Sequence, residues 1–436
     1  MRVLFAVALL AGLLYVAVTP PDRVPDENAH FLRAVAMAEG DFFPPIGFRL
    51  PGHHFPAGIR MFLHTLGNRD PAAKFTLDEM RAVHAVPLLR EQRAGIEFPA
   101  LYSPLPYAIP AGVAFIGLQA GARPFWIFYL GRVANLLVCL TIAWAALRAI
   151  PNRAAVGAAV LLLPMTLYQL ASWSADAITI SVALLLTCLL VRNLEAEDVA
   201  ATRELAAIGV VAFLLGLCKP GYFLLLVPLF FVPTHRFGTG RRRAATVVLV
   251  TAAMLLGTLL AVASARAGRF NVRQDLPVDP AQQMRCVTDD PVRFAGVFVR
   301  DLGSNGRFYL EQAVGRLGLM NVKLPGSLVV AEWLLLLWTG FTCGVRWKSA
   351  ARVASLAACA AILAGISITL YFLWSIICGD TIEGVQGRYY LPVLPLLLFA
   401  LSLKARERGA SLVTVAIAGL IANGIAVAVL LDFFWR

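Results

Sequence analysis

Two adjacent carboxylates and a histidine, Asp26, Glu27 and His30, stand immediately after the first apolar run of the chain. Pro25 suits the first position of a helix, which would place both acids in the first turn, where the positive end of the helix dipole keeps them ionised. His30 and Arg33 follow at helical spacing, on or near the same face. A carboxylate with an orienting neighbour can act as a general base. An acid pair at a helix start with solvated partners is an equally good interpretation.

Three more ionisable residues stand at the ends of later apolar runs: Asp176, Lys219 and Arg388. An ionisable group within a membrane span costs roughly 2.5–3.5 kcal/mol on insertion scales, so it usually has a partner or a function. Asp176 would either cap a helix or belong to a site. Lys219 and Arg388 could bind a phosphate, for which the fork of arginine is well suited, or reach towards lipid headgroups. Tyr389 could line a groove for an isoprenoid chain or anchor the chain at the interface.

The composition indicates a membrane protein. The 436 residues are 59% hydrophobic and only 15% charged, against about 45–50% and about 25% in soluble domains. We therefore expect an all-α polytopic fold, with any site built from helix ends and loops. The net charge of +12 does not indicate nucleic-acid binding, because the basic residues mostly separate the apolar runs, as the positive-inside rule describes.

About eleven apolar runs approach the roughly 20 residues that a spanning helix needs. They are 3–19, 126–147, 154–171, 176–191, 204–218, 220–234, 244–265, 327–345, 353–377, 389–403 and 410–431. The first run is interpreted as an uncleaved anchor; a cleaved signal peptide is the alternative, but no small-x-small cleavage site stands out. A further apolar stretch, 103–118, contains Pro104, Pro106 and Pro110, which break helices. We expect this stretch to lie at the membrane surface or to re-enter, without crossing.

The basic residues predict the orientation. Fifteen of them lie at the N-terminus and in alternate connections between the runs, whereas the other short connections hold only Lys219 and Arg388. This asymmetry places the basic connections in the cytoplasm. The N-terminus is then inside, the C-terminus is outside, and two long segments, 20–125 and 266–326, face the exterior. We expect these segments to contain short helices that pack on the membrane surface.

Cysteines and carboxylates limit the choice of cofactor. Five of the seven cysteines lie in apolar runs and are expected to be small core residues. Cys286 and Cys378 could form an external disulfide, but their spacing gives no support for one. No CxxC pair occurs, so a zinc or redox centre is not expected. If the site holds a metal ion, Asp26, Glu27 and Asp176 are the expected ligands, because carboxylates suit Mg²⁺ or Mn²⁺.

Four segments together carry a resemblance. Residues 25–33, Pro-Asp-Glu-Asn-Ala-His-Phe-Leu-Arg, resemble the P-D-E-x-x-H-F-x-R signature of a broad family of bacterial membrane proteins grouped with the GT-C glycosyltransferases. Three further segments match that family in order: 172–176 (Ser-Trp-Ser-Ala-Asp), 315–320 (Gly-Arg-Leu-Gly-Leu-Met) leading to Leu324-Pro325, and 384–392 (Gly-Val-Gln-Gly-Arg-Tyr-Tyr-Leu-Pro). The layout is also similar to that of lipid A aminoarabinose transferases and protein O-mannosyltransferases.

The resemblance implies a single GT-C-like membrane domain over residues 1–436. It implies that Asp26, or Glu27 as the alternative, acts at the transfer centre together with Asp176. The remaining expected site residues are Lys219, Arg388 and Tyr389 at the donor phosphate and lipid, with His30, Arg33 and Tyr102 in support. Lys219 is similar to the lysine of the corresponding outer turn in aminoarabinose transferases.

The activity that the resemblance implies is transfer of a sugar from a polyprenyl-phosphate donor to an envelope glycan or lipid, with inversion, at the outer face of the bacterial inner membrane. A protein-sequon acceptor is not expected, because the chain lacks the soluble C-terminal domain of oligosaccharyltransferases. Two other classes of protein stay open: a transporter or flippase for lipid-linked glycans, and a non-catalytic assembly partner.

Overall fold

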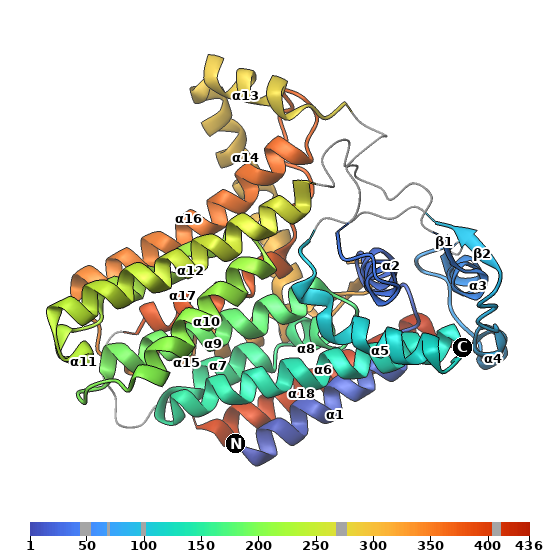
Figure 1. Ribbon diagram of the computed structural model, residues 1–436, viewed down its shortest axis with the longest axis horizontal. Helices are drawn as coiled ribbons and strands as arrows, with labels where there is room; N and C mark the ends of the chain where they lie inside the picture. The colour runs from blue at the N-terminus through green and yellow to red at the C-terminus, as the bar shows by residue number, and fades with distance from the viewer. Residues whose placement is uncertain (44–53, 68–69, 97–101, 267–276, 403–410) are drawn as a thin grey trace.

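The computed structural model describes residues 1–43, 54–67, 70–96, 102–266, 277–402 and 411–436. Long apolar helices lie side by side in a bundle, and shorter elements from two distant parts of the chain cover one end of it (Figure 1). The two described sheets are small antiparallel pairs. The all-α prediction is therefore confirmed for the described part of the chain.

Five of the described helices are long and apolar enough to cross a membrane. They are α6 (Pro124–Ala149), α9 (Ala175–Glu195), α12 (Gly240–Arg266), α16 (Ser349–Leu373) and α18 (Leu412–Phe434). A sixth candidate is the pair α7 (Ala154–Leu161) and α8 (Pro164–Leu170), which is bent by 81°. Three more helices have 17 residues each: α1 (Arg2–Val18), α10 (Thr202–Cys218) and α15 (Gly326–Thr342).

The structure thus supports five or six spans by length and composition, where the sequence predicts about eleven. A helix of 17 residues is roughly 26 Å long, slightly less than the roughly 30 Å of a hydrocarbon core. The run 220–234 forms the 3-10 helix η3 (Phe223–Phe231), which contains Pro228. The run 389–403 divides into η4 (Gly387–Tyr390) and the seven-residue α17 (Leu394–Ala400).

The stretch 103–118 forms η1 (Leu105–Tyr107) and α5 (Ala108–Gln119). The twelve residues of α5 span roughly 18 Å, which is too short to cross, in agreement with the expectation drawn from its prolines. The elements at the basic connections are short as well: η2 (Pro151–Arg153) and α11 (Thr234–Phe237).

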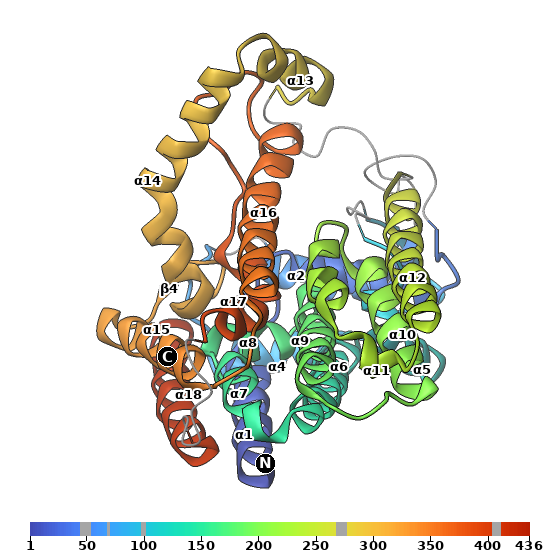
Figure 2. The same ribbon diagram turned by 90° about the vertical axis from the view of Figure 1, so that its left-hand side faces the viewer.

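The first long segment folds over one end of the bundle, as Figure 1 shows. Its elements are α2 (Glu27–Ala38), β1 (His54–Pro56), α3 (Ala57–Gly67), α4 (Leu77–Ala85) and β2 (Arg93–Gly95), with β1 and β2 paired antiparallel. Figure 2 shows the second segment rising beside α16. It contains α13 (Pro280–Asp289), α14 (Pro291–Gly315), β3 (Arg316–Leu317) and β4 (Val322–Lys323).

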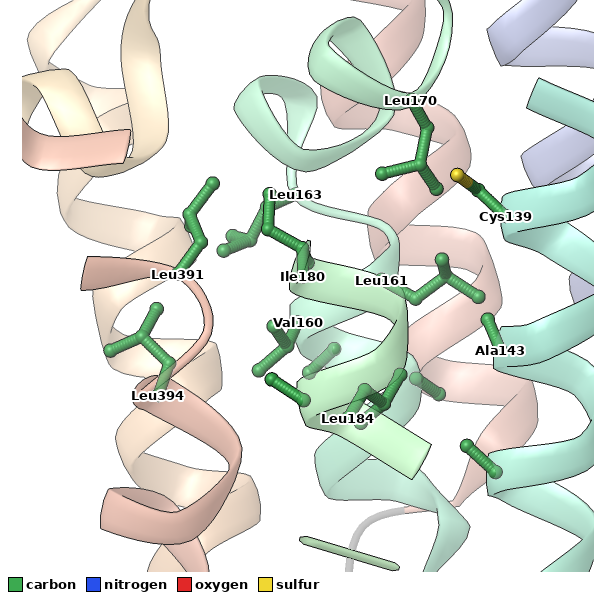
Figure 3. Close-up of a cluster of buried hydrophobic side chains, with 14 of the residues drawn as sticks. Cys139, Ala143, Val160, Leu161, Leu163, Leu170, Ile180, Leu184, Leu391 and Leu394 are labelled. Carbon is green, nitrogen blue, oxygen red and sulfur yellow. The ribbon is translucent and has the colours of Figure 1, made fainter. Parts of the chain in front are cut away.

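The core sits where α7, α8 and α9 meet α6 and the segment around α17. Figure 3 shows Leu163 between Leu391 and Ile180 of α9, whereas Leu161 lies toward Ala143 of α6. In the most apolar 18-residue stretch of α9, 78% is buried, against 28% in the corresponding stretches of α12 and α16. A helix that is apolar on all sides belongs in the interior, so α9 is the central helix and the other two present a large face to lipid.

Hydrogen bonds identify the two ends of the bundle. The indole of Trp435 donates to Val18 O at 2.7 Å, so α18 finishes beside the end of α1. At the opposite end, Arg153 pairs with Glu195 and donates to Cys343 O, while Arg352 donates to Ala400 O. We call these the loop-covered end and the basic end. The basic residues Lys404, Arg406 and Arg408 of the same prediction lie outside the described residues.

A disulfide joins Cys286 of α13 to Cys378, which follows α16. Their Cα atoms are 5.7 Å apart, within the usual range for disulfides. Sequence spacing gives no hint of this bond, because the two cysteines are separated by 92 residues and are brought together only when α13 packs beside the end of α16.

Candidate functional site

Four segments far apart in the sequence meet at the loop-covered end. Asp26 directly precedes α2, Asp176 lies in the first turn of α9, Lys219 follows the last residue of α10, and Arg388 lies in η4. The expectation that these two acids and two cations share one face is therefore met in the structure.

The four charged side chains form a row in which acids and bases alternate. Lys219 forms an ion pair with one carboxylate oxygen of Asp176. Arg388 Nε lies 3.2 Å from the other oxygen, Oδ2, of Asp176, and its Nη2 donates to Asp26 Oδ2 at 2.6 Å. Nη1 of the same guanidinium donates to the carbonyl of Pro25 at 3.2 Å. Arg388 thus connects the two acid-bearing segments.

Exposure differs sharply along this row. The side chain of Asp26 is 58% exposed, whereas those of Arg388, Asp176 and Lys219 are 4%, 6% and 11% exposed. Asp26 therefore stands at the mouth of the site, where a substrate can reach it. The other three charges form a buried floor that exchanges little with bulk water.

Tyrosine rings flank the cations. Lys219 Nζ lies 4.9 Å from the ring centre of Tyr102 and 4.7 Å from that of Tyr389, and the Arg388 guanidinium lies 5.4 Å from the Tyr389 ring. Such distances are typical of cation–π contacts. The predicted supporting residue Tyr102 and the predicted donor-site residue Tyr389 are therefore both part of the cluster.

His30 lines the same site as a neutral group. Its Nδ1 lies 2.8 Å from the Tyr107 hydroxyl, and its ring centre is 5.9 Å from that of Tyr102. Burial lowers the pKa of His30 to about 4, although the nearby charges of Asp26 and Asp176 oppose this effect. At neutral pH the imidazole is uncharged, and it can take part in the site by donating one hydrogen bond and accepting another.

Asp26 is ionised at neutral pH. Desolvation by the surrounding protein raises its pKa, but the charge of Arg388, the hydrogen bond from Arg388 and the nearby His30 together outweigh that effect, and the pKa lies below its ordinary value. The residue adopts a left-handed backbone conformation with φ 64°, which aspartate tolerates better than most residues. The helix begins one residue later, at Glu27, so the prediction that both acids lie in the first turn is wrong for Asp26.

Asp176 does not cap α9, because another residue is the N-cap of that helix. The N-cap of α9 is Ser174, whose hydroxyl accepts from the backbone N–H of Asp176 at 3.1 Å and donates to Gln169 Oε1 at 2.9 Å. The capping interpretation of Asp176 is therefore wrong. Its carboxylate is left for Lys219 and Arg388.

Two glycines explain the segment that carries Arg388. Gly384 has φ +80°, a conformation that favours glycine. A Cβ atom on Gly387 would lie 2.1 Å from the carbonyl oxygen of Tyr309, and the Gly387 N–H donates to Gln312 Oε1 at 2.8 Å. Only glycine lets this segment approach α14 so closely, and this close contact fixes the backbone position of Arg388.

Glu27 and Arg33 lie outside the cluster. Both oxygens of Glu27 accept from Arg132, at 2.8 and 2.7 Å, and neither side chain is exposed. Arg33 donates to the carbonyls of Asp41 and Phe42 and so holds the chain after α2. Sequence reasoning missed Arg132; the available signal was an arginine inside the apolar run 126–147.

The acids show no arrangement for a metal ion. Within the described ranges no group of three or more His, Cys, Asp or Glu side chains is placed to hold one. Asp26 and Asp176 are bridged by a guanidinium, and Glu27 faces Arg132. The charge that a divalent cation would neutralise is already met by arginine and lysine.

An apolar groove of about 690 Å³ opens beside the cluster. Its lining comes from the end of α2, from η1 and α5, and from α10 and α12, and includes Met37, Leu105, Phe115, Leu217 and Leu260. Ser103, in the same lining, follows Tyr102 and donates to Leu217 O at 2.6 Å, two residues before Lys219. The groove is thus lined by residues that stand next to Tyr102 and close to Lys219 in the chain, while the four charged residues themselves do not line it.

Comparison with known proteins places the chain in a family. Neither a curated protein nor a solved structure matches it. A family model described as a predicted membrane protein, DUF2142, matches residues 9–397, which include every segment of the cluster. This chain therefore belongs to the DUF2142 family of predicted membrane proteins.

Proposed function

We propose that this protein is an integral membrane glycosyltransferase of the GT-C type that transfers a sugar from a polyprenyl-phosphate donor to an envelope glycan or lipid. The observation that carries the proposal is the row of charges: an exposed carboxylate at the mouth, two buried cations behind it and an apolar groove beside them. A lipid-linked phosphate sugar has the matching parts, an apolar chain, an anion and an electrophilic carbon.

In the proposed reaction Asp26 accepts the proton of an acceptor hydroxyl as that oxygen attacks the anomeric carbon of the donor. The bond between this carbon and the phosphate oxygen breaks, and polyprenyl phosphate leaves with the bonding electrons. Lys219 and Arg388 stabilise the charge that grows on the phosphate. Attack opposite the leaving group inverts the anomeric configuration.

A donor phosphate would compete with two carboxylates of the protein for Arg388. The same guanidinium that would hold the phosphate forms ion pairs with Asp26 and Asp176 in the structure. A phosphate that takes over part of Arg388 weakens its bond to Asp26, and the carboxylate becomes a stronger base. Donor binding would in this way prepare the base for the acceptor.

The disulfide supports an external site. Disulfides persist in oxidising compartments and are rare in the cytosol, and Cys378 lies ten residues before Arg388 in the segment that leads to the cluster. The charge asymmetry of the connections gives the same orientation. We propose that the loop-covered end faces the periplasm of a bacterial inner membrane.

This orientation predicts the labelling pattern of introduced cysteines. Arg123→Cys and Asp78→Cys should both react with a membrane-impermeant thiol reagent added to intact spheroplasts, because α5 does not cross between them. Arg241→Cys, at the basic end, should react only after the membrane is opened. Protection of Arg123→Cys with labelling of Asp78→Cys would mean that α5 crosses and that the orientation is wrong.

The most direct test of the function is the lipid content of cells that lack the protein. We expect mass spectrometry of their extracts to show an accumulated polyprenyl-phosphate sugar, which expression of the native chain removes and expression of Asp26→Asn does not. An unchanged lipid profile would reject the donor.

Arg388→Ala should weaken the binding of a short-chain polyprenyl phosphate by about 1.5–3 kcal/mol, the scale of a hydrogen bond to a charged group, or roughly 10- to 150-fold. Arg388→Lys should restore only part of it, because the fork is lost. Binding can be followed by calorimetry in detergent. Arg300→Ala, an exposed arginine of the second segment, is the control, and equal affinity in Arg388→Ala and Arg300→Ala would leave Arg388 a purely structural role.

A further inference from the structure

A second charged group, outside the reacting cluster, joins the segments that carry its two acids. Arg132 of α6 donates to the carbonyls of Thr19 and Pro20, at 2.6 and 3.1 Å, and to both oxygens of Glu27. These contacts fix both ends of the chain between α1 and α2. Asp26 is the last residue of that stretch before Glu27.

The same carboxylate reaches the segment of the second acid. The backbone N–H of Trp173 donates to Glu27 Oε1 at 3.2 Å, and the Trp173 indole donates to Phe128 O at 2.8 Å. Trp173 immediately precedes Ser174, the cap that positions Asp176. One glutamate–arginine pair therefore links α1, α2, α6 and the start of α9.

The backbone between the two anchors is strained. Asp22 and Asp26 both adopt the left-handed region, with φ 61° and 64°. Such conformations persist only where the surrounding structure determines them. A buried ion pair, in turn, is rarely more stabilising than apolar packing of the same volume. A positioning role accounts for both the strained backbone and the buried ion pair, because the pair holds the strained stretch in a single conformation.

We infer that Glu27 and Arg132 are positioning residues, which hold Asp26 against Arg388 and Asp176 beside Lys219 without touching the substrate. The inference deepens the proposed function, since Asp26 matters as a base only if transfer occurs. Its geometric content, that the pair sets the contact between position 26 and Arg388, can be tested without any donor.

The test uses Asp26→Cys as a reporter. A free cysteine has a pKa of about 8.5, and a neighbouring cation lowers it, so Arg388 should shift the titration of a thiol at this exposed position. The native cysteines give little background, because five are buried and two form the disulfide. The rate of alkylation by a water-soluble reagent against pH gives the midpoint, with the native chain as the blank.

We expect a midpoint about one pH unit or more below 8.5 in Asp26→Cys, and a return towards 8.5 when Arg388→Ala is added. Adding Arg132→Lys or Glu27→Gln to Asp26→Cys should raise the midpoint by at least half of the rise that Arg388→Ala causes. Arg33→Lys is the matched control, because Arg33 is also a buried arginine of this end but holds only the chain after α2; it should leave the midpoint unchanged.

Each result decides the inference. If Arg132→Lys does not fold, Glu27→Gln decides, since it keeps the shape of the side chain and its oxygen for Trp173. An unchanged midpoint in both backgrounds, with the expected shift in Arg388→Ala, overturns the positioning role. No shift in Arg388→Ala shows that position 26 does not contact the cation, which overturns the inference at its origin. Failure of the transfer reaction alone would leave the titration result standing.

Discussion

Replacing Asp26 by asparagine should abolish sugar transfer while the protein still inserts and folds. Asparagine keeps the shape of the side chain, tolerates the left-handed conformation and still offers an oxygen to Arg388. It cannot take the proton of the acceptor. General-base catalysis contributes about 10²–10⁴-fold, so we expect a loss of that size in the initial rate of transfer from a polyprenyl-phosphate sugar.

Asp78→Asn is the matched control, because Asp78 belongs to the same outer segment but is 86% exposed on α4. Its rate should equal that of the native chain. Near-normal transfer in Asp26→Asn would refute the base. The acid pair would then be an ordinary helix start, and a non-catalytic assembly partner would be the better description of the protein.

The dependence of this rate on pH has a defined direction. A base works only when deprotonated, so the rate should fall as the pH drops through the pKa of Asp26. Since Arg388 holds that pKa below its ordinary value in the protein without donor, the acid limb of kcat/KM for the donor should lie at lower pH than the titration of an ordinary aspartate. Arg388→Ala should move the limb to higher pH, because the stabilising charge is lost while burial still favours the neutral acid. A limb that stays in place would show that another group is the base.

The members of the cluster could be foreseen because the chain marks them by type. Asp176, Lys219 and Arg388 are ionisable residues at the ends of apolar runs, where a membrane protein tolerates charge only for a reason. Alternation of the chain across the bundle then brings such ends to one face. The pairing of Lys219 with Asp176 and of Arg388 with both acids depends on side-chain directions, which the sequence does not contain.

The neighbours Asp26 and Glu27 show where sequence reasoning failed. The left-handed turn at Asp26 makes the helix begin at Glu27, two residues later than Pro25 suggests, so the two carboxylates point to different surroundings. One meets Arg388, 362 residues away, and the other meets Arg132, 105 residues away. Local spacing cannot distinguish acids whose roles depend on such distant partners.

The eleven predicted spans are not confirmed, and the reason is local. Runs such as 220–234 and 389–403 are as apolar as a spanning helix, and apolarity was the criterion for counting them. Pro228 lies inside the first, which forms a 3-10 helix, and the second breaks between η4 and α17. These segments are buried against α9 and α16, and they therefore need apolar side chains whether or not they cross the membrane.

The buried pair gives the largest expected change in stability. Arg132→Met leaves the carboxylate of Glu27 without its partner in a site that is closed to water, with both side chains at 0% exposure. Removing one partner of a buried ion pair costs about 3–5 kcal/mol. Arg93→Met is the control: Arg93 also binds a glutamate with two hydrogen bonds, but it is 39% exposed, so its loss should cost less than about 1 kcal/mol.

The double change Glu27→Leu with Arg132→Met separates stability from placement. Apolar side chains of similar size can replace a buried pair at little cost, so the free energy of unfolding should return most of the way to the native value. The backbone carbonyls of Thr19 and Pro20 and the N–H of Trp173 still lose their partners, so Asp26 and Asp176 are no longer fixed. Because a misplacement of about 1 Å can cost roughly 100-fold in rate, transfer should stay at least about tenfold below the native rate. Recovery of both stability and transfer would show that the pair only fills space, and recovery of stability alone would show that its charge is kept for the geometry of the site.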